Sequence, residues 1–316
     1  MYHQIDRSQI VNRWNRDYPM RTWVASGDTL TVQMRDSSDG QVRPDLTLDE
    51  FRQLDPLRIH ALTGPIGIEG AEPGDRLCVE FISYAHEGWA WTSMMPGLGL
   101  LPEDFPEHFL QLWKLEEAET FSMPGLRIPL APFCGIVGVQ PAAFGEFRTR
   151  PPGVFGGNMD VRHLVAGNVL HLPVQVPGAG LCLGDAHAAQ GDGEVSINGM
   201  EAPMTVTVKV SLVKNSPLRG PYVDCRVPLE PEAFQRSAHH AFVASHEDPR
   251  EAAKQAVRRA IDYLMDRLGL SAPQAYVTCS VLLRLKISQL VNLPITTVTG
   301  YLPEAAFLEP PLEFPR

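Results

Sequence analysis

Residues that could do chemistry gather in one short stretch, residues 184–194, directly after the apolar run Leu181–Leu183. Its acidic and imidazole side chains are Asp185, His187, Asp192 and Glu194. Carboxylates and imidazoles bind divalent cations, and a nearby Glu can move protons for a reacting water. Gly191–Gly193 is also a common turn sequence. Composition alone therefore leaves a metal or acid–base site and a plain turn as equal alternatives.

The position of Asp185 separates it from the other aspartates that lie next to glycine. Asp28 and Asp75 each follow a glycine and precede an alternating apolar segment, so we expect both to cap turns. Asp185 instead follows its apolar run. The next alternating segment, residues 204–210, predicts a strand that returns across the site. We therefore expect residues 185–194 to form a loop, or a bulged strand end, between two strands.

Other polar residues lie among glycines elsewhere in the chain. His60 precedes the segment 61–65, and a lone histidine of this kind is more often structural than functional. Asn158 and Asp160 follow Gly156 and Gly157, where an Asx turn and a functional site are equal alternatives. Cys134 lies in a glycine-rich apolar segment and is a candidate nucleophile, but it has no basic residue close in sequence.

Composition describes a globular protein and limits its partners. The 316 residues are 44% apolar and 20% charged, with a net charge of -10, which argues against a nucleic-acid partner. No stretch reaches the ~18 apolar residues of a membrane span, and residues 1–15 lack the apolar core of a secretory signal. Five cysteines without a C-x-x-C pair suggest neither disulfides nor a thiolate zinc site. A cytoplasmic location is the expectation.

The elements that must position these residues change character along the chain. The 28 prolines and 26 glycines cut residues 1–230 into short segments typical of a mainly β, sandwich-like or barrel-like body, with a smaller α+β region. We expect this body to carry the site. Residues 231–316 predict a helical region packed on the same unit: one helix from Asp248 as cap to Gly269, and a second over 273–291 with Ser271 as cap. An extended tail is expected from Glu309.

The chain lacks standard nucleophile and nucleotide motifs, but five phrases resemble the acetamidase/formamidase family of amide hydrolases. These phrases are HALTGPIGIEGAEPGD (60–75), GWAWTSMMPGLGLL (88–101), GIVGVQP (135–141), GGNMDVRHLVAGNVLHLPV (156–174) and VPGAGLCLGDAHAAQGDGEV (176–195). The segment AYVTCSVLLRLKISQLVN (275–292) is similar to the closing helix of that family. The resemblance favours a functional reading of residues 184–194.

The resemblance implies hydrolysis of a short-chain amide, such as formamide or acetamide, to a carboxylate and ammonia. It also implies a β-rich fold, a homodimer or higher homo-oligomer, and a divalent metal, which we expect to be zinc, with calcium or manganese as alternatives. Carried over residue by residue, the metal ligands are Asp160, Asp185 and His187. Glu194 is then the candidate general base, and His60 and Asn158 would hold the substrate or the developing oxyanion.

Three alternatives remain open at this point. Gly67 and Cys134 depart from the usual phrasing of the family, which allows a larger amide as substrate. A non-catalytic binding protein could keep the fold with a structural ion, most simply calcium. An enzyme could instead use Cys134 as its nucleophile.

Overall fold

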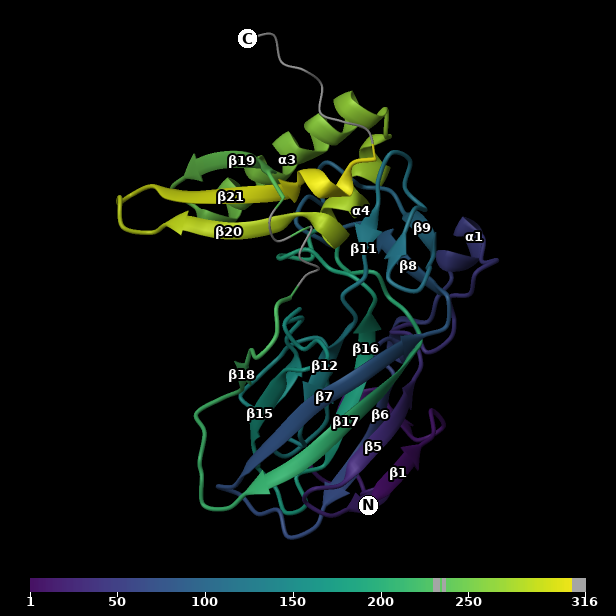
Figure 1. The fold of residues 1–316 in the computed structure, drawn as a ribbon, viewed down its shortest axis with the longest axis vertical. Helices are drawn as coiled ribbons and strands as arrows, with labels where there is room; N and C mark the ends of the chain where they lie inside the picture. The colour runs from purple at the N-terminus through teal and green to yellow at the C-terminus, as the bar shows by residue number, and fades with distance from the viewer. Residues whose placement is uncertain (230–233, 235–236, 309–316) are drawn as a thin grey trace. The chain divides into compact units, whose positions relative to one another are not determined.

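The chain forms two compact units, each assembled from three stretches of sequence. The computed structural model describes residues 1–229, 234 and 237–308 (Figure 1). Unit 1 comprises residues 1–87, 132–188 and 201–229. Unit 2 comprises residues 88–131, 189–200 and the described residues after 229. Strands outnumber helices in the described residues, so the prediction of a mainly β fold is confirmed.

The first sheet of unit 1 has the strand order β1-β5-β17-β7-β15-β18. Its strands are β1 (Tyr2–Ile5), β5 (Thr29–Met34), β7 (Arg76–His86), β15 (Val169–Pro173), β17 (Met204–Val213) and β18 (Tyr222–Asp224). In β17 the valines at 206, 208 and 210 are buried while the residues between them are more exposed. This period of two places one face of the sheet in the core.

The second sheet of unit 1 carries the site. Its order is β14-β12-β16-β6-β2, and β4 lies parallel beside β6. The strands are β2 (Ile10–Val11), β4 (Thr22–Val24), β6 (Leu62–Ile68), β12 (Phe133–Gly138), β14 (Gly156–Asn158) and β16 (Leu181–His187). Every residue of β6, β12 and β16 is buried. Figure 1 shows the two sheets as layers, so unit 1 has the predicted sandwich-like body.

Shorter elements complete unit 1. The strands β3 (Arg13–Trp14) and β13 (Phe147–Arg148) pair with each other, and α1 (Leu48–Phe51) and η1 (Pro56–Arg58) lie in the connection between β5 and β6. The turn aspartates behave as predicted. Asp28 accepts a hydrogen bond from the amide of Ala25 at 2.9 Å, and Asp75 accepts one from the amide of Glu72 at 2.9 Å.

Unit 2 combines short hairpins with a helix-covered sheet. The strands β8 (Trp89–Met94) and β9 (Phe109–Lys114) pair, as do β10 (Glu119–Thr120) and β11 (Ile128–Pro129). A three-stranded sheet has the order β19 (His239–His246), β21 (Thr296–Pro303) and β20 (Arg284–Gln289), and η2 (Glu304–Ala306) follows it. Helix α3 (Pro249–Leu268) packs on β19 and β21, and α4 (Ala272–Leu282) packs on α3 and β8.

The first C-terminal helix matches its prediction and the second does not. Asp248 caps α3 by accepting from the amide of Arg250 at 2.8 Å, and Gly269 ends it at φ 66°. Ser271 caps α4, but the helix ends at Leu282 and not near 291. Residues 284–289 form β20, antiparallel to β21. The alternation in this segment fits an edge strand, and its pairing with β21 overrides the apparent helical spacing.

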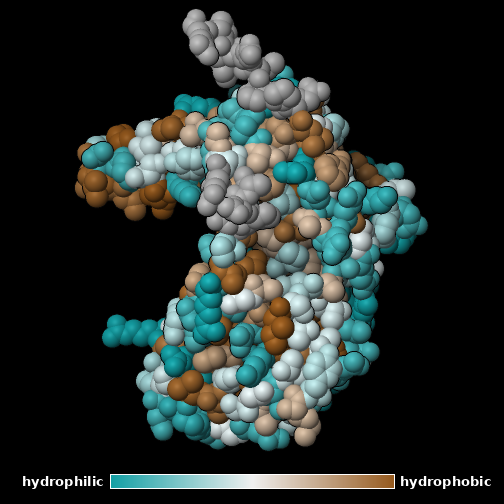
Figure 2. Space-filling view, in the orientation of Figure 1, coloured by the Kyte–Doolittle hydropathy of each residue, from teal (hydrophilic) through white to brown (hydrophobic). Residues whose placement is uncertain are grey.

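Exposed apolar side chains mark the hairpin between β20 and β21. Ile287, Leu290, Val291 and Leu293 are all more than half exposed. Figure 2 shows hydrophobic surface at the outer end of this hairpin. Among the described residues, no helix is both long and apolar enough to cross a membrane. The tail predicted from Glu309 onward lies outside the described residues.

Candidate active site

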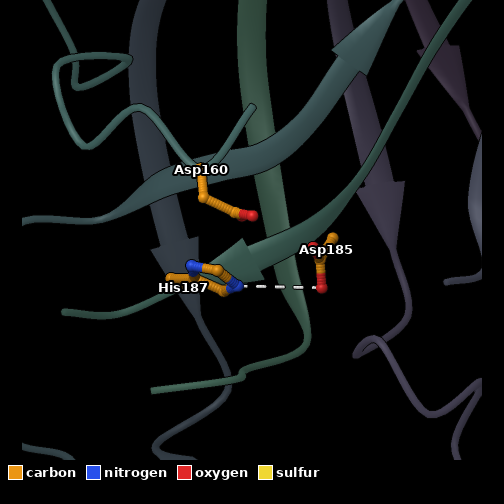
Figure 3. Close-up of side chains that lie close together, drawn as sticks. All are labelled: Asp160, Asp185 and His187. Atoms are coloured by element: carbon orange, nitrogen blue, oxygen red, sulfur yellow. Dashed lines mark ion pairs between the residues drawn. The ribbon is translucent and has the colours of Figure 1, made fainter. Parts of the chain in front are cut away.

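The last residues of β16 place an aspartate and a histidine side by side in the core of unit 1. Asp185 and His187 are two positions apart and both belong to the strand, so the expected loop begins only after His187. Their side chains are buried, and Asp185 Oδ1 lies 3.7 Å from His187 Nε2 (Figure 3). Asp185 has a φ of 54°, which costs a non-glycine residue on the order of 1–3 kcal/mol and is concentrated at functional sites.

Asp160 reaches the same place from the turn after β14. Its amide donates to the carbonyl of Gly135 in the neighbouring β12 at 3.2 Å, and it also has a positive φ of 48°. One potential ligand atom from each of Asp160, Asp185 and His187 lies within 4.8 Å of the others. Figure 3 shows the three side chains converging from one strand, β16, and the turn after β14.

Gly135 makes this convergence sterically feasible. A Cβ at this position would lie 2.6 Å from Asp160 Oδ1 and 2.9 Å from Asp185 Oδ2. These separations are well below normal contact distances, so a larger residue would push the two carboxylates apart. The glycine in the segment 135–141 therefore leaves room for two acids to approach one point.

Sequence reasoning missed a third carboxylate, Glu201, which is as deeply buried as Asp185. It lies just before β17, forms an isolated bridge with His187, and its Oε1 lies 2.9 Å from His187 Nε2. The signal was present, because Glu201 is flanked by Met200 and Ala202 at the entrance to a confident strand. An acid in that apolar setting requires a partner.

The buried groups of this cluster have pKa values shifted in different directions. Burial raises the pKa of Glu201 to about 8, and the negative charge of Asp185 adds to the rise against the opposing effect of His187. Burial also raises the pKa of Asp185, but His60 and His187 together lower it to a value well below its usual range. Burial lowers the pKa of His187, but Glu201 and Asp185 outweigh it and raise the value well above normal. One buried carboxyl thus holds a proton near neutral pH while its neighbour stays ionised.

His60 enters the site from the connection that follows η1. Its Nδ1 lies 3.1 Å from the hydroxyl of Thr149, and its amide donates to the carbonyl of Ser37 at 2.7 Å. Burial lowers the pKa of His60, and the negative charge of Asp185 opposes this shift. Its φ of 62° makes it the third residue of the site, with Asp160 and Asp185, in the left-handed region.

Asn158 and Glu194 were also predicted as site residues. Asn158 lies in β14 opposite Ile136, and its Nδ2 donates to the carbonyl of Arg150 at 3.1 Å. Among the described residues its buried Oδ1 has no hydrogen-bond partner. Glu194 belongs to unit 2, in the segment 189–200, with a φ of 46°. Its role as a general base stays a prediction.

The thiol of Cys134 does not fit the role of a nucleophile. It is fully buried, lies 3.7 Å from the sulfur of Met34, and burial raises its pKa to about 12. A thiol is nucleophilic as the thiolate, which this environment disfavours. Burial and the raised pKa therefore argue against the alternative enzyme in which Cys134 attacks the substrate.

The donor set suits a divalent cation. Two carboxylates and one imidazole offer hard oxygen and nitrogen ligands from a rigid buried strand and an adjacent turn. The space at Gly135 keeps them close together. These observations define a β-rich protein with a buried acid–imidazole centre that can hold a cation and move protons.

Comparisons with known proteins identify the family to which this β-rich protein belongs. The acetamidase/formamidase family model matches residues 2–144 and 141–309. A formamidase of Methylophilus methylotrophus is 27% identical over 370 aligned residues, covering 95% of this chain and 89% of the relative. A gamma lactamase from Delftia acidovorans has a similar structure, with a TM-score of 0.90 and 26% identity over 98% of this chain and 95% of that one.

A structure of an acetamidase from Bacillus halodurans gives a TM-score of 0.68 at 31% identity, over 95% of this chain and 97% of that one. The chain therefore belongs to the acetamidase/formamidase family. The resemblance seen in the sequence is confirmed, and so is the prediction of an amidase.

Proposed function

We propose that the protein hydrolyses the C–N bond of a small amide at the cluster formed by Asp160, Asp185, His187 and Glu201. The observation that carries this proposal is the convergence of these side chains: potential ligand atoms of Asp160, Asp185 and His187 lie within 4.8 Å of one another, and His187 Nε2 lies 2.9 Å from Glu201 Oε1. Glu201 keeps its proton to about pH 8, while Asp185 is ionised. An amide is a weak electrophile with a poor leaving group, so its hydrolysis needs both stabilised negative charge and a proton for the departing nitrogen.

Each residue has a distinct task in this proposal. Water adds to the amide carbon and the C–N bond breaks, Glu201 delivers its proton to the leaving nitrogen, and the proton that the water loses returns Glu201 to its acid form. The hydrogen bond between His60 Nδ1 and Thr149 fixes the imidazole, which leaves Nε2 as the atom able to contact the substrate oxygen. The Oδ1 of Asn158, which has no hydrogen-bond partner among the described residues, offers an acceptor for the N–H of the substrate amide. The buried strands exclude bulk water and strengthen these interactions.

The proposal includes a divalent metal held by Asp160, Asp185 and His187, with zinc favoured and calcium or manganese as alternatives. The mutual separation of at most 4.8 Å between ligand atoms supports this assignment. When bound, the cation supplies Lewis-acid polarisation of the amide carbonyl.

A cyclic amide is a second candidate substrate, and one observation favours it. The TM-score is 0.90 for the gamma lactamase and 0.68 for the acetamidase, although the sequence identities are similar. Hydrolysis of a γ-lactam breaks the same kind of bond as hydrolysis of formamide or acetamide, and both groups remain on one product. The active centre proposed here serves either reaction.

A panel of amides tests the function. Ammonia release from formamide, acetamide, propionamide and longer amides would be measured beside ring opening of γ-butyrolactam, in the purified protein, after chelation and after return of each metal. We expect turnover of at least one class, loss on chelation and recovery with a preferred metal. Turnover of none would favour the non-catalytic binding protein, and full activity without metal would contradict the metal assignment.

Assembly and location belong to the same proposal. Self-association as a homodimer or higher oligomer, and a cytoplasmic location, stay predictions from the sequence. Size-exclusion chromatography with light scattering measures the mass in solution and decides the first.

A further inference from the structure

Two segments of unit 1 run beside each other and end at the active site. The amide of His60 donates to the carbonyl of Ser37 at 2.7 Å, which joins the segment after β5 to the segment after η1. His60 then contacts Thr149, while a hydrogen bond from Ser37 reaches the carboxyl of Glu201. One backbone hydrogen bond therefore joins two residues that each contact the site.

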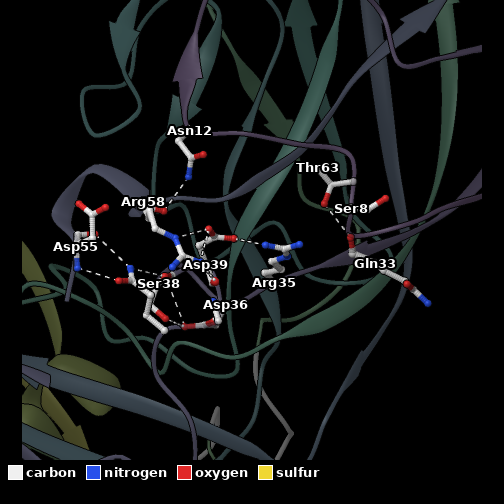
Figure 4. A network of polar contacts seen from close by, with 12 residues as sticks. Ser8, Asn12, Gln33, Arg35, Asp36, Ser38, Asp39, Asp55, Arg58 and Thr63 are labelled. Carbon is white, nitrogen blue, oxygen red and sulfur yellow. Dashed lines mark hydrogen bonds and ion pairs between the residues drawn. The ribbon is translucent and has the colours of Figure 1, made fainter. Parts of the chain in front are cut away.

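An ion pair joins the same two segments one step farther from the site (Figure 4). The guanidinium of Arg58 donates to Asp39 Oδ2 from Nε at 2.9 Å, and its Nη2 donates to the Asp39 carbonyl at 3.0 Å. The Asp39 carboxylate is 7% exposed, whereas the side chain of Arg58 is 48% exposed. Two or more contacts from one planar group fix direction as well as distance.

Asp39 and Arg58 each form a further hydrogen bond with a residue outside the pair. Asp39 has a φ of 62° and receives a second guanidinium, that of Arg35, at 2.6 Å. The carbonyl of Arg58 accepts from Asn12 Nδ2 at 2.8 Å. The pair is thus anchored to β5 on one side and to the β2 region on the other.

Arg58 and Asp39 are each close in sequence to a residue that contacts the site. Arg58 is two residues before His60, and Asp39 is two residues after Ser37. Two residues of chain span at most about 7 Å, so a shift of Arg58 is passed to His60 with little slack. The carboxylate–guanidinium contacts and the His60–Ser37 hydrogen bond form two cross-links between the segments, and only the second lies at the site.

A purely stabilising ion pair does not explain this arrangement. Arg43 and Glu50 form an ion pair at 2.6 Å in the same connection, but both side chains are about half exposed and contact α1, away from His60. Exposed pairs of that kind contribute about 0–1 kcal/mol to stability. The Arg58–Asp39 pair differs because its carboxylate is buried and its contacts include the backbone.

We infer that Arg58 and Asp39 are positioning residues that hold the imidazole of His60 in its productive place. The inference rests on the proposed function, in which His60 contacts the amide. A displacement of catalytic groups by about 1 Å can lower the rate 100-fold, whereas substrate affinity changes little when the binding contacts remain.

The test compares three variants in the full-length protein loaded with its preferred metal. In Arg58→Gln we expect kcat to fall about 10- to 100-fold, with KM within about twofold. Arg58→Lys keeps the charge without the planar fork and should lose less. Arg43→Gln is the matched control, because it removes an ion pair from the same connection, and its kcat should stay within about twofold of the wild type. Asp39→Asn serves if Arg58→Gln folds poorly, since Asn also accepts a positive φ.

Two readouts separate positioning from general destabilisation. In a background of His60→Gln, adding Arg58→Gln should change kcat by less than about twofold, because residues that act through one another are non-additive. The imidazole resonance of His60, read by NMR, should shift in Arg58→Gln and not in Arg43→Gln. Additive losses, or an unchanged resonance, overturn the inference. If no amide is turned over by the wild type, the proposed function fails and the resonance alone decides the positioning role.

Discussion

His187 Nε2 and Glu201 Oε1 lie 2.9 Å apart where β16 of one sheet ends and the chain enters β17 of the other. This contact joins an imidazole and a carboxyl that are both buried. The carboxyl has its pKa raised to about 8, so the pair holds a proton in the interior at neutral pH.

Replacing Glu201 tests its role as the proton donor. Glu201→Gln keeps the shape and removes the transferable proton, so we expect kcat to fall about 10²- to 10⁴-fold with the fold intact. Steady-state kinetics measures kcat, and circular dichroism shows whether the fold is intact. Glu87→Gln, which breaks only an exposed ion pair with Arg7, is the control and should keep full activity. A normal kcat in Glu201→Gln would show that Glu201 is not the proton donor, and Glu194 would then be the next residue to replace.

The stability of the chelated protein should fall as pH rises from about 6.5 to 8. The folded pKa values of Glu201 and His187 are both raised above their values in the unfolded chain. In this window the unfolded chain has released those protons and the folded protein still binds them, so raising the pH favours unfolding. Each such proton contributes about 1.4 kcal/mol per pH unit.

Urea denaturation of the chelated protein at several pH values measures this slope. Glu201→Gln should reduce it, because one of the two retained protons is gone. A slope near zero in the wild type, or one that rises with pH, would show that the cluster is not protonated as described.

Gly135→Ala tests the space between the two carboxylates. The new Cβ would lie 2.6 Å from Asp160 Oδ1, so we expect activity to fall at least tenfold and the free energy of unfolding to drop by about 1–3 kcal/mol. Gly220→Ala is the control, since nothing lies within 4 Å of the added atom. Activity and urea midpoints compare the two, and equal behaviour would mean that the carboxylates tolerate separation.

Asp160→Asn tests the metal assignment directly. Losing the charge of one of the two carboxylate ligands should weaken zinc binding at least tenfold, measured by competition with a chromogenic chelator. Asp17→Asn removes an exposed carboxylate and should leave affinity unchanged. Unaltered zinc affinity in Asp160→Asn would place the metal elsewhere.

Cys134→Ala should remain active. The thiol is buried with its pKa raised to about 12, so its loss costs about 1 kcal/mol of stability from packing and leaves kcat within about twofold. Complete loss of turnover in a folded variant would restore the thiol as a nucleophile.

The sequence predicted the parts of this site that local pattern controls. Asp185 was separated from the turn aspartates because it follows an apolar run, although the structure continues that strand through Asp185 to His187. Asp248, Ser271 and Gly269 marked helix ends through capping chemistry that acts over a few residues.

The parts it did not predict depend on pairing between distant segments. Glu201 becomes a site residue through its bridge to His187, and β20 is a strand because β21 pairs with it. The role of Gly135 emerges only when Asp160 and Asp185 converge beside it. Such partners are set by the sheet register, which a single sequence specifies weakly.

Because the bridge between His187 and Glu201 joins the two sheets, the return of activity should report when the sheets have packed together. Asp185 and His187 belong to β16, whereas Glu201 leads into β17 of the opposite layer, so neither sheet alone assembles the proton-holding cluster. During refolding, turnover should return only with the slowest step that brings the two layers together. Partly folded molecules with one intact sheet would show no activity, even when their secondary structure has recovered.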